Sequence, residues 1–222
     1  MCGRYSLSTD IEGLSFRFDF KAMGLTFHER YNIAPTQYVL TVTNDGSENQ
    51  AQMMKWGLIP FWAKDPKIGN RSINARAETL HARPMFRSAF QKRRCLVIAD
   101  GFYEWMKEGK KKIPMRIALR SGEPFGFAGL WERWEDPDGQ LVQSCSIVTT
   151  TPNELIAPIH DRMPVILPKQ FERRWLVPGS QDQDSLKALL APYSALEMDA
   201  YPVSTLVNSP KNDITEILER VS

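Results

Sequence analysis

The middle of the chain is a succession of short, strand-like runs separated by turns, and this pattern limits the possible folds more than any other feature of the sequence. Each run is shorter than a typical helix and rich in β-branched or aromatic residues, which is typical of strands. The runs are Arg94–Ala99, Phe102–Trp105, Met115–Leu119, Phe125–Trp131, Ser144–Thr150 and Met163–Leu167. Because short connections can join only antiparallel neighbours, the pattern predicts a mostly antiparallel β core.

A further hairpin is predicted nearer the N-terminus, in a region that otherwise reads as loops. The turn signal Asn44-Asp45-Gly46 separates the strand-like runs Tyr38–Thr43 and Gln52–Trp56. Between this hairpin and the basic middle of the chain, Gly57–Asn70 combines Pro, Gly and aromatic residues and predicts an irregular loop.

Helices are expected at the edges of this β core. Residues Thr151–Glu154 have the form of a capping box and predict a short helix that Pro158 ends. The other predicted helices are at Lys169–Trp175, at Asp184–Leu190 and, at the C-terminus, at about 213–221. A chain of 222 residues can form one domain with a substantial core. We therefore predict a single α+β domain over residues 1–222.

Basic residues are concentrated in one part of the chain. From Lys64 to Arg120 there are fifteen Lys and Arg against five Asp and Glu, although the net charge of the whole chain is only +2. This asymmetry indicates a polyanionic partner such as nucleic acid, while a solvated basic face has the same composition.

The sequence also limits the location of the protein and its cofactors. No apolar run approaches the length of a membrane span, and Met1–Asp10 lacks the apolar core of a signal peptide. We expect no membrane partner and a cytoplasmic, nucleoid-associated protein, or a nuclear one in a eukaryote. Cys2, Cys95 and Cys145 have no metal-ligand spacing, so no metal and no cofactor are expected.

Cys2 differs from the other two cysteines. Cys95 and Cys145 lie in strand-like runs and are expected in the core, whereas no apolar run surrounds Cys2. Removal of Met1 would leave Cys2 with an amine of pKa about 7.7–8.0 next to a thiol of pKa about 8.5. The amine can form a Schiff base with an aldehyde, and the thiol can then close a thiazolidine ring on the same carbon. A cysteine that has no function and lies near the N-terminus by chance would give the same sequence.

Three further segments hold candidate polar residues. Asn74 and Arg76 share one face of an extended segment and can contact a phosphate or a sugar. Glu104 lies between apolar neighbours in a strand-like run, which favours its protonated form and a role in proton transfer. His160 lies on a loop between a predicted helix and a predicted strand. Taken alone, each is equally compatible with a structural role.

Aromatic residues adjoin the basic region. Phe61 and Trp62 lie in the irregular loop, where exposed rings can stack on unpaired bases. Trp56 is expected in the core instead.

In this order, these motifs resemble the SRAP (SOS-response-associated peptidase) family, whose members crosslink to abasic sites. The resemblance covers most of the chain, from residue 2 to about residue 208. The matching segments are Met1–Arg4, Tyr31–Pro35, Trp56–Pro60, Ile73–Glu78, Ala99–Trp105, Ile159–Pro164, Pro202–Ser204 and Val207–Asn208.

The resemblance implies a curved, barrel-like sheet and covalent capture of abasic sites in single-stranded DNA during replication-coupled repair. It implies that Cys2 is the nucleophile, with Asn74, Glu104 and His160 as its catalytic neighbours. The DNA contacts that it implies are Arg4, Pro35, Phe61, Trp62, Arg76 and Arg162. The expected protein is a monomer with replication-fork proteins as possible partners.

Two alternatives remain open from the sequence. A cysteine-dependent peptidase could use Cys2 with His160, for example to remove Met1. A non-catalytic reader of single-stranded or modified DNA would use only the aromatic and basic residues.

Overall fold

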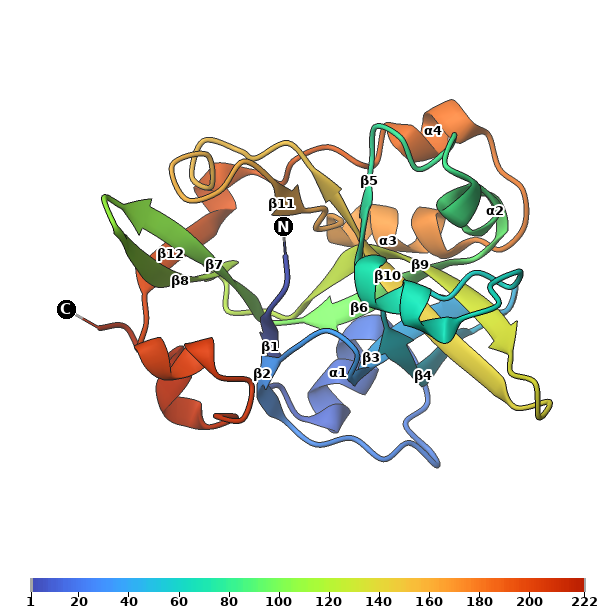
Figure 1. Cartoon of the computed structure of the whole chain (residues 1–222), viewed down its shortest axis with the longest axis horizontal. Helices are drawn as coiled ribbons and strands as arrows, with labels where there is room; N and C mark the ends of the chain where they lie inside the picture. The colour runs from blue at the N-terminus through green and yellow to red at the C-terminus, as the bar shows by residue number, and fades with distance from the viewer. Residues whose placement is uncertain (1, 222) are drawn as a thin grey trace.

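The computed structural model describes residues 2–221, and its centre is a closed five-stranded β-barrel (Figure 1). The barrel strands are β3 (Tyr38–Asn44), β4 (Asn49–Trp56), β6 (Arg94–Ala99), β9 (Phe125–Glu135) and β10 (Leu141–Thr150). Closure arises because β10 pairs with both β9 and β4, at the two ends of the order β4-β3-β6-β9. Within the barrel, only the β10–β4 pairing is parallel. Two short strands, β5 (Asn74–Arg76) and β11 (Met163–Pro164), also pair with β10.

A second sheet of five strands extends to one side of the barrel (Figure 1). Its order is β12-β8-β7-β1-β2, and all of its pairings are antiparallel. The strands are β1 (Tyr5–Leu7), β2 (Arg30–Ile33), β7 (Gly101–Glu108), β8 (Lys111–Leu119) and β12 (Met198–Pro202). Asp100 is the only residue between β6 of the barrel and β7 of this sheet, so the two sheets are directly connected. The predicted α+β domain with a barrel-like, mostly antiparallel sheet is confirmed.

Helices are short and lie at the periphery (Figure 1). The α-helices are α1 (Ile11–Phe18), α2 (Pro84–Lys92), α3 (Lys169–Leu176) and α4 (Gln183–Lys187). The 3-10 segments are η1 (Pro66–Arg71), η2 (Ala195–Glu197), η3 (Thr205–Asn208) and η4 (Thr215–Leu218).

The first strand is anchored in the barrel core by Tyr5. Its ring lies 5.2 Å from that of Trp56 and 5.9 Å from that of Phe127, both edge-on. Trp56 is fully buried and donates its indole N–H to the Ile73 carbonyl at 2.9 Å, which confirms its predicted place in the core. This packing fixes the direction from which the N-terminal residues reach the barrel.

Three predictions about helices were wrong. The short helix predicted from the capping box at Thr151–Glu154 is absent: residues 154–159 are turns, because Pro158 has no N–H to continue the hydrogen bond from the Ala157 N–H to the Asn153 carbonyl. The predicted helix at about 213–221 is only the 3-10 segment η4, because the Asp213 carboxylate accepts from the backbone N–H groups of β2. Conversely, α1 lies where a loop was predicted, and Asp10 caps it by accepting from the Gly13 N–H at 2.7 Å.

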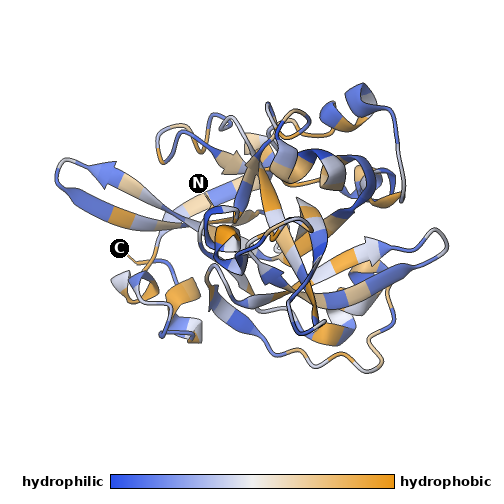
Figure 2. Ribbon diagram, turned by 45° about the vertical axis from the view of Figure 1, so that its right-hand side comes forward, coloured by the Kyte–Doolittle hydropathy of each residue, from blue (hydrophilic) through white to orange (hydrophobic). Residues whose placement is uncertain are grey.

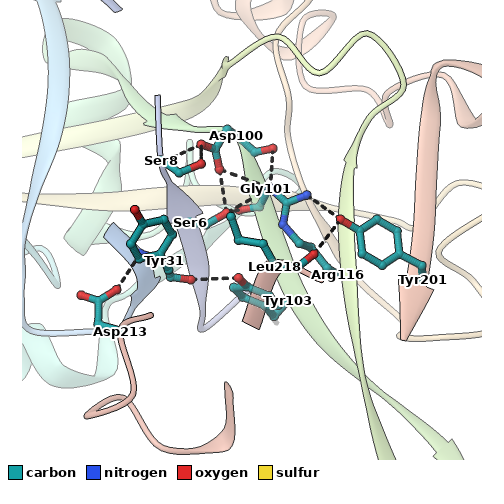
Figure 3. A network of polar contacts seen from close by, with 10 residues as sticks. All are labelled: Ser6, Ser8, Tyr31, Asp100, Gly101, Tyr103, Arg116, Tyr201, Asp213 and Leu218. Atoms are coloured by element: carbon teal, nitrogen blue, oxygen red, sulfur yellow. Dashed lines mark hydrogen bonds and ion pairs between the residues drawn. The ribbon is translucent and has the colours of Figure 1, made fainter. Parts of the chain in front are cut away.

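A polar network holds β1 against β7 and β8 (Figure 3). Asp100 accepts from the hydroxyls of Ser6 and Ser8, each at 2.7 Å, and its carboxylate lies 3.4 Å from the Arg116 guanidinium. Arg116 in turn donates to the Tyr201 hydroxyl on β12 at 2.9 Å. The network crosses four strands and fixes β1, and with it the N-terminal segment, on the second sheet.

Replacing Tyr103 with Phe is expected to lower the free energy of unfolding by about 1 kcal/mol. Its hydroxyl donates to the Tyr31 carbonyl at 2.8 Å and links β7 to β2 (Figure 3). The phenylalanine keeps the ring packing but leaves that carbonyl without this donor. Urea denaturation of both proteins measures the difference, and equal midpoints with equal slopes would contradict the role of this hydrogen bond.

Candidate active site

The N-terminal segment reaches the centre of the molecule along β7. Tyr5 pairs with Phe102 and Ser6 with Gly101, and the Tyr103 N–H donates to the Arg4 carbonyl at 2.9 Å. Continuing this antiparallel register by two residues sets Gly3 opposite Glu104. The pairing of β1 with β7 therefore brings the start of the chain beside a residue more than one hundred positions away.

Cys2 is fully buried and belongs to the main hydrophobic core. This burial is not indicated by the residues next to Cys2 in the sequence. Burial raises the pKa of the Cys2 thiol, and the charge of Glu104 raises it further. The thiol is therefore protonated near neutral pH. Cys95 and Cys145 are buried in strands of the barrel, as predicted.

Asn74 is directly attached to the N-terminal segment. It lies on β5, where it pairs with Ile147 of β10, and its side-chain N–H donates to the Cys2 carbonyl at 2.8 Å. The Asn74 side-chain oxygen is buried and has no hydrogen-bond partner among residues 2–221. A buried acceptor without a donor costs free energy, so this oxygen is suited to accept from a bound ligand or from an amine at position 2.

Glu104 and His160 form a carboxyl–imidazole pair next to Cys2. The Glu104 side chain is 4% exposed, and its Oε2 lies 3.9 Å from Nε2 of His160. Burial raises the pKa of Glu104, as expected from its position between apolar residues of β7. A carboxyl group with a raised pKa can exchange protons close to neutral pH.

The backbone selects the tautomer of His160. Its Nδ1 accepts from the Arg162 N–H at 3.0 Å, which leaves the ring proton on Nε2, facing Glu104. The Asp161 carboxylate also lies 2.9 Å from Nδ1, but this side chain is 87% exposed and screened by solvent, so the backbone contact determines the tautomer.

Arg4, Arg76 and Arg162 have different surroundings. Arg76 is exposed on β5, two residues after Asn74. The Arg162 guanidinium binds both carboxylate oxygens of Glu78, at 2.6 and 3.0 Å. Arg4 donates to the Asn32 side chain at 2.7 Å and to the Val207 carbonyl at 2.6 Å. Of the three residues, only Arg76 is exposed, whereas Arg4 and Arg162 are half-buried.

Phe61 and Trp62 are exposed on the loop that follows β4, with 61% and 49% of their surfaces accessible. The ends of this loop are held together at Gly57, where φ is +134° and an added Cβ would lie only 2.6 Å from the Gly69 carbonyl oxygen. Pro35 is half-buried next to the start of the same loop, because the Thr36 N–H donates to the Trp56 carbonyl.

The structure thus brings Cys2, Asn74, Glu104 and His160 together from four separate segments of the chain. Among residues 2–221, no hydrogen bond, ion pair or ring contact joins Phe61, Trp62 or Pro35 to these four residues. Sequence reasoning missed Glu78 as the partner of Arg162, and missed Trp105, whose ring lies 5.8 Å from the Arg4 guanidinium. Both residues stand within the matching motifs, so the motifs were the available signal.

The described residues contain neither a metal-binding cluster nor a membrane-spanning helix. Within residues 2–221, no cluster of three or more His, Cys, Asp or Glu side chains is arranged to hold a metal ion. No helix in the described part of the chain is long and apolar enough to cross a membrane.

Known proteins resemble the chain over its whole length. It is 51% identical to the abasic site processing protein YoqW of Bacillus subtilis (strain 168), over 99% of both chains. It is 30% identical to the abasic site processing protein YedK of Escherichia coli (strain K12), over 100% of both chains. A crystal structure of a protein from Bacteroides thetaiotaomicron superposes with a TM-score of 0.91 at 30% identity, again over 100% of both chains. The family model described as SOS response associated peptidase (SRAP) matches residues 1–210. The chain therefore belongs to the SRAP family.

Proposed function

We propose that this protein processes abasic sites in single-stranded DNA by forming a covalent crosslink through Cys2 after Met1 has been removed. The observation that carries the proposal is the convergence of Cys2 with Asn74, Glu104 and His160. An aminothiol, an acceptor amide and a carboxyl–imidazole pair are the groups that aldehyde capture requires. The names of the relatives YoqW and YedK, both abasic site processing proteins, support the same substrate.

The first steps open the sugar and capture its aldehyde. An abasic deoxyribose is mostly a closed hemiacetal ring, and proton transfer by Glu104 or His160 opens it to the aldehyde. The Cys2 amine then adds to the aldehyde carbon, and loss of one water gives the Schiff base. The Asn74 side chain orients Cys2 through the carbonyl that it already binds at 2.8 Å.

The thiol acts after the amine. Because burial keeps the Cys2 thiol protonated, it reacts only once the imine carbon lies beside it. The sulfur adds to this carbon while its proton passes to the imine nitrogen, directly or through Glu104, and the thiazolidine ring closes. Ring closure removes the imine, which otherwise promotes strand cleavage. The relative rates of these two steps determine whether the site protects DNA or acts as a lyase.

The direct test mixes protein lacking Met1 with a single-stranded oligonucleotide that carries one abasic site, followed by a denaturing gel without reductant. The proposal expects a slow band that requires both the abasic site and Cys2. An oligonucleotide with all bases intact is the matched control. If mass spectrometry shows that Met1 is absent and no band forms, the proposal fails.

The DNA partner also requires phosphate contacts, and Arg76 is the exposed candidate beside the site. Arg76→Ala is expected to weaken binding and to reduce the slope of log affinity against log salt by about 0.7, the contribution of one phosphate contact to a single strand. Arg174→Ala, which removes the same charge from α3, is the control. Fluorescence anisotropy with a labelled single strand measures both, and an equal effect of the two substitutions would contradict a specific role for Arg76.

We propose that five further residues contact the DNA: Arg4, Arg162, Trp62, Phe61 and Pro35. Arg162 would have to exchange Glu78 for a phosphate, whereas the exposed rings of Phe61 and Trp62 can stack on a base next to the lesion. We also propose that the protein acts as a monomer alongside replication-fork proteins, where DNA is single-stranded.

A further inference from the structure

The hairpin of β7 and β8 projects beyond the rest of the second sheet, and its tip is hydrophilic (Figures 1 and 2). The two strands pair continuously from Phe102 opposite Ile117 to Glu108 opposite Lys111. Gly109 and Lys110 close the hairpin, with Gly109 at φ +59°. A two-residue turn with glycine first matches the twist of its strands, so the tip is well defined.

The tip is strongly basic. Lys107, Lys110, Lys111 and Lys112 are all exposed, and Glu108 is the only acidic residue among positions 107–112. Within the described part of the chain, none of these four lysines forms an ion pair. Lys107 and Lys112 pair directly across the two strands, an arrangement that is destabilising for like charges. An anionic partner would relieve this repulsion.

The same hairpin carries the candidate active site at its base. Glu104 lies on β7 three residues before Lys107. At about 3.3 Å per residue, Lys107 is roughly 10 Å and the turn roughly 20 Å from Glu104 along the strand. Successive phosphates of one strand are about 3.4 Å apart along the axis of B-form DNA, and they lie farther apart in an extended single strand. The lysines therefore lie within about six nucleotides of a lesion held at Glu104.

We propose that this lysine tip, residues 107–112, is a second DNA-binding element that contacts the phosphates of nucleotides within about six positions of the abasic site. This inference rests on the proposed function. The contacts of the lysine tip do not depend on the DNA sequence, because lysine ammonium groups bind phosphates as point charges. The tip would determine how much flanking DNA the protein needs, while the chemistry stays at Cys2.

The test measures non-covalent binding, so that it does not depend on crosslinking. The probe is a labelled oligonucleotide with a tetrahydrofuran abasic analogue, which cannot open to an aldehyde, flanked by twelve or by two nucleotides on each side. For the long single-stranded probe, K110A/K111A is expected to weaken binding several-fold and to reduce the salt slope by about 1.4, since each lost contact to a single strand contributes about 0.7. For the short probe, the variant is expected to bind like the parent protein.

Two further variants separate this role from a general loss of positive charge and from a loss of stability. K169A/R174A removes two positive charges from α3 and is expected to leave both probes unaffected. K107Q/K112Q removes the opposed pair and is expected to raise the melting temperature while weakening binding to the long probe. Equal binding of the parent and K110A/K111A to the long probe, or an equal loss with both probes, would overturn the proposal. Because the probe cannot crosslink, a failure of the Cys2 chemistry would leave this result unchanged.

Discussion

Replacing Cys2 with alanine is expected to abolish the stable crosslink to abasic DNA while preserving the first chemical step. The variant still loses Met1, because alanine is also small, and it therefore still presents an N-terminal amine. That amine can form the Schiff base, but no sulfur is available to close the ring. We expect no gel band under ordinary conditions, a band after borohydride reduction, and more strand cleavage than with the parent protein.

The matched control is Cys95→Ala, since Cys95 is equally buried but lies in the barrel strand β6. Its crosslinking should equal that of the parent protein wherever it remains folded. A stable, reductant-free crosslink from the Cys2→Ala protein would exclude the thiazolidine mechanism. Loss of the borohydride-trapped band as well would show that the sulfur is already needed for capture.

Replacing Glu104 with glutamine is expected to slow crosslinking by about 100- to 10,000-fold, the usual contribution of a positioned acid or base. Glutamine has nearly the same shape but cannot exchange a proton. Because burial raises the pKa of Glu104, folding favours its protonated form, and this carboxyl destabilises the fold as the pH rises through its raised pKa. The neutral glutamine should therefore leave the melting temperature at pH 7 unchanged or higher.

The pH profile distinguishes proton transfer from a purely structural effect. A plot of the crosslinking rate of the parent protein against pH should contain a limb, that is, a range in which the rate changes because Glu104 titrates. This limb should lie above the ordinary glutamate pKa of about 4.3. The Glu104→Gln profile should lack this limb. A rate within threefold of the parent protein in the variant, or an unchanged limb, would contradict the role of Glu104 in proton transfer.

The sequence predicted the surroundings of Glu104 well, because a strand has a period of two and its neighbours could be assigned to one face. It predicted the barrel strand β6 for a different reason, since Cys95–Ala99 is a continuous apolar run. The convergence of Asn74 and His160 on Cys2 came only from the family resemblance. No local pattern encodes the pairing of β1 with β7 or of β5 with β10.

The errors have a common physical cause, which is competition from distant partners. Asp213 reads as the start of a helix, yet its carboxylate binds the backbone of Tyr31 and Asn32 across the fold. Arg162 was expected to be free to contact DNA, yet its guanidinium forms an ion pair with Glu78, 84 residues earlier in the chain. Cys2 lies at the start of the sequence with no apolar run around it, yet the position of β1 places it in the hydrophobic core. Each contact joins residues far apart in sequence, so local propensity could not predict it.

The central claim is tested most directly by the intact mass of the crosslinked product. Protein shown to lack Met1 is incubated with a single-stranded abasic oligonucleotide, and the adduct is weighed and then digested to locate the modified residue. The account predicts one adduct, equal to the processed protein plus the oligonucleotide minus one water, with the modification on Cys2. An adduct on another residue, an adduct that retains Met1, or no adduct at all would contradict it.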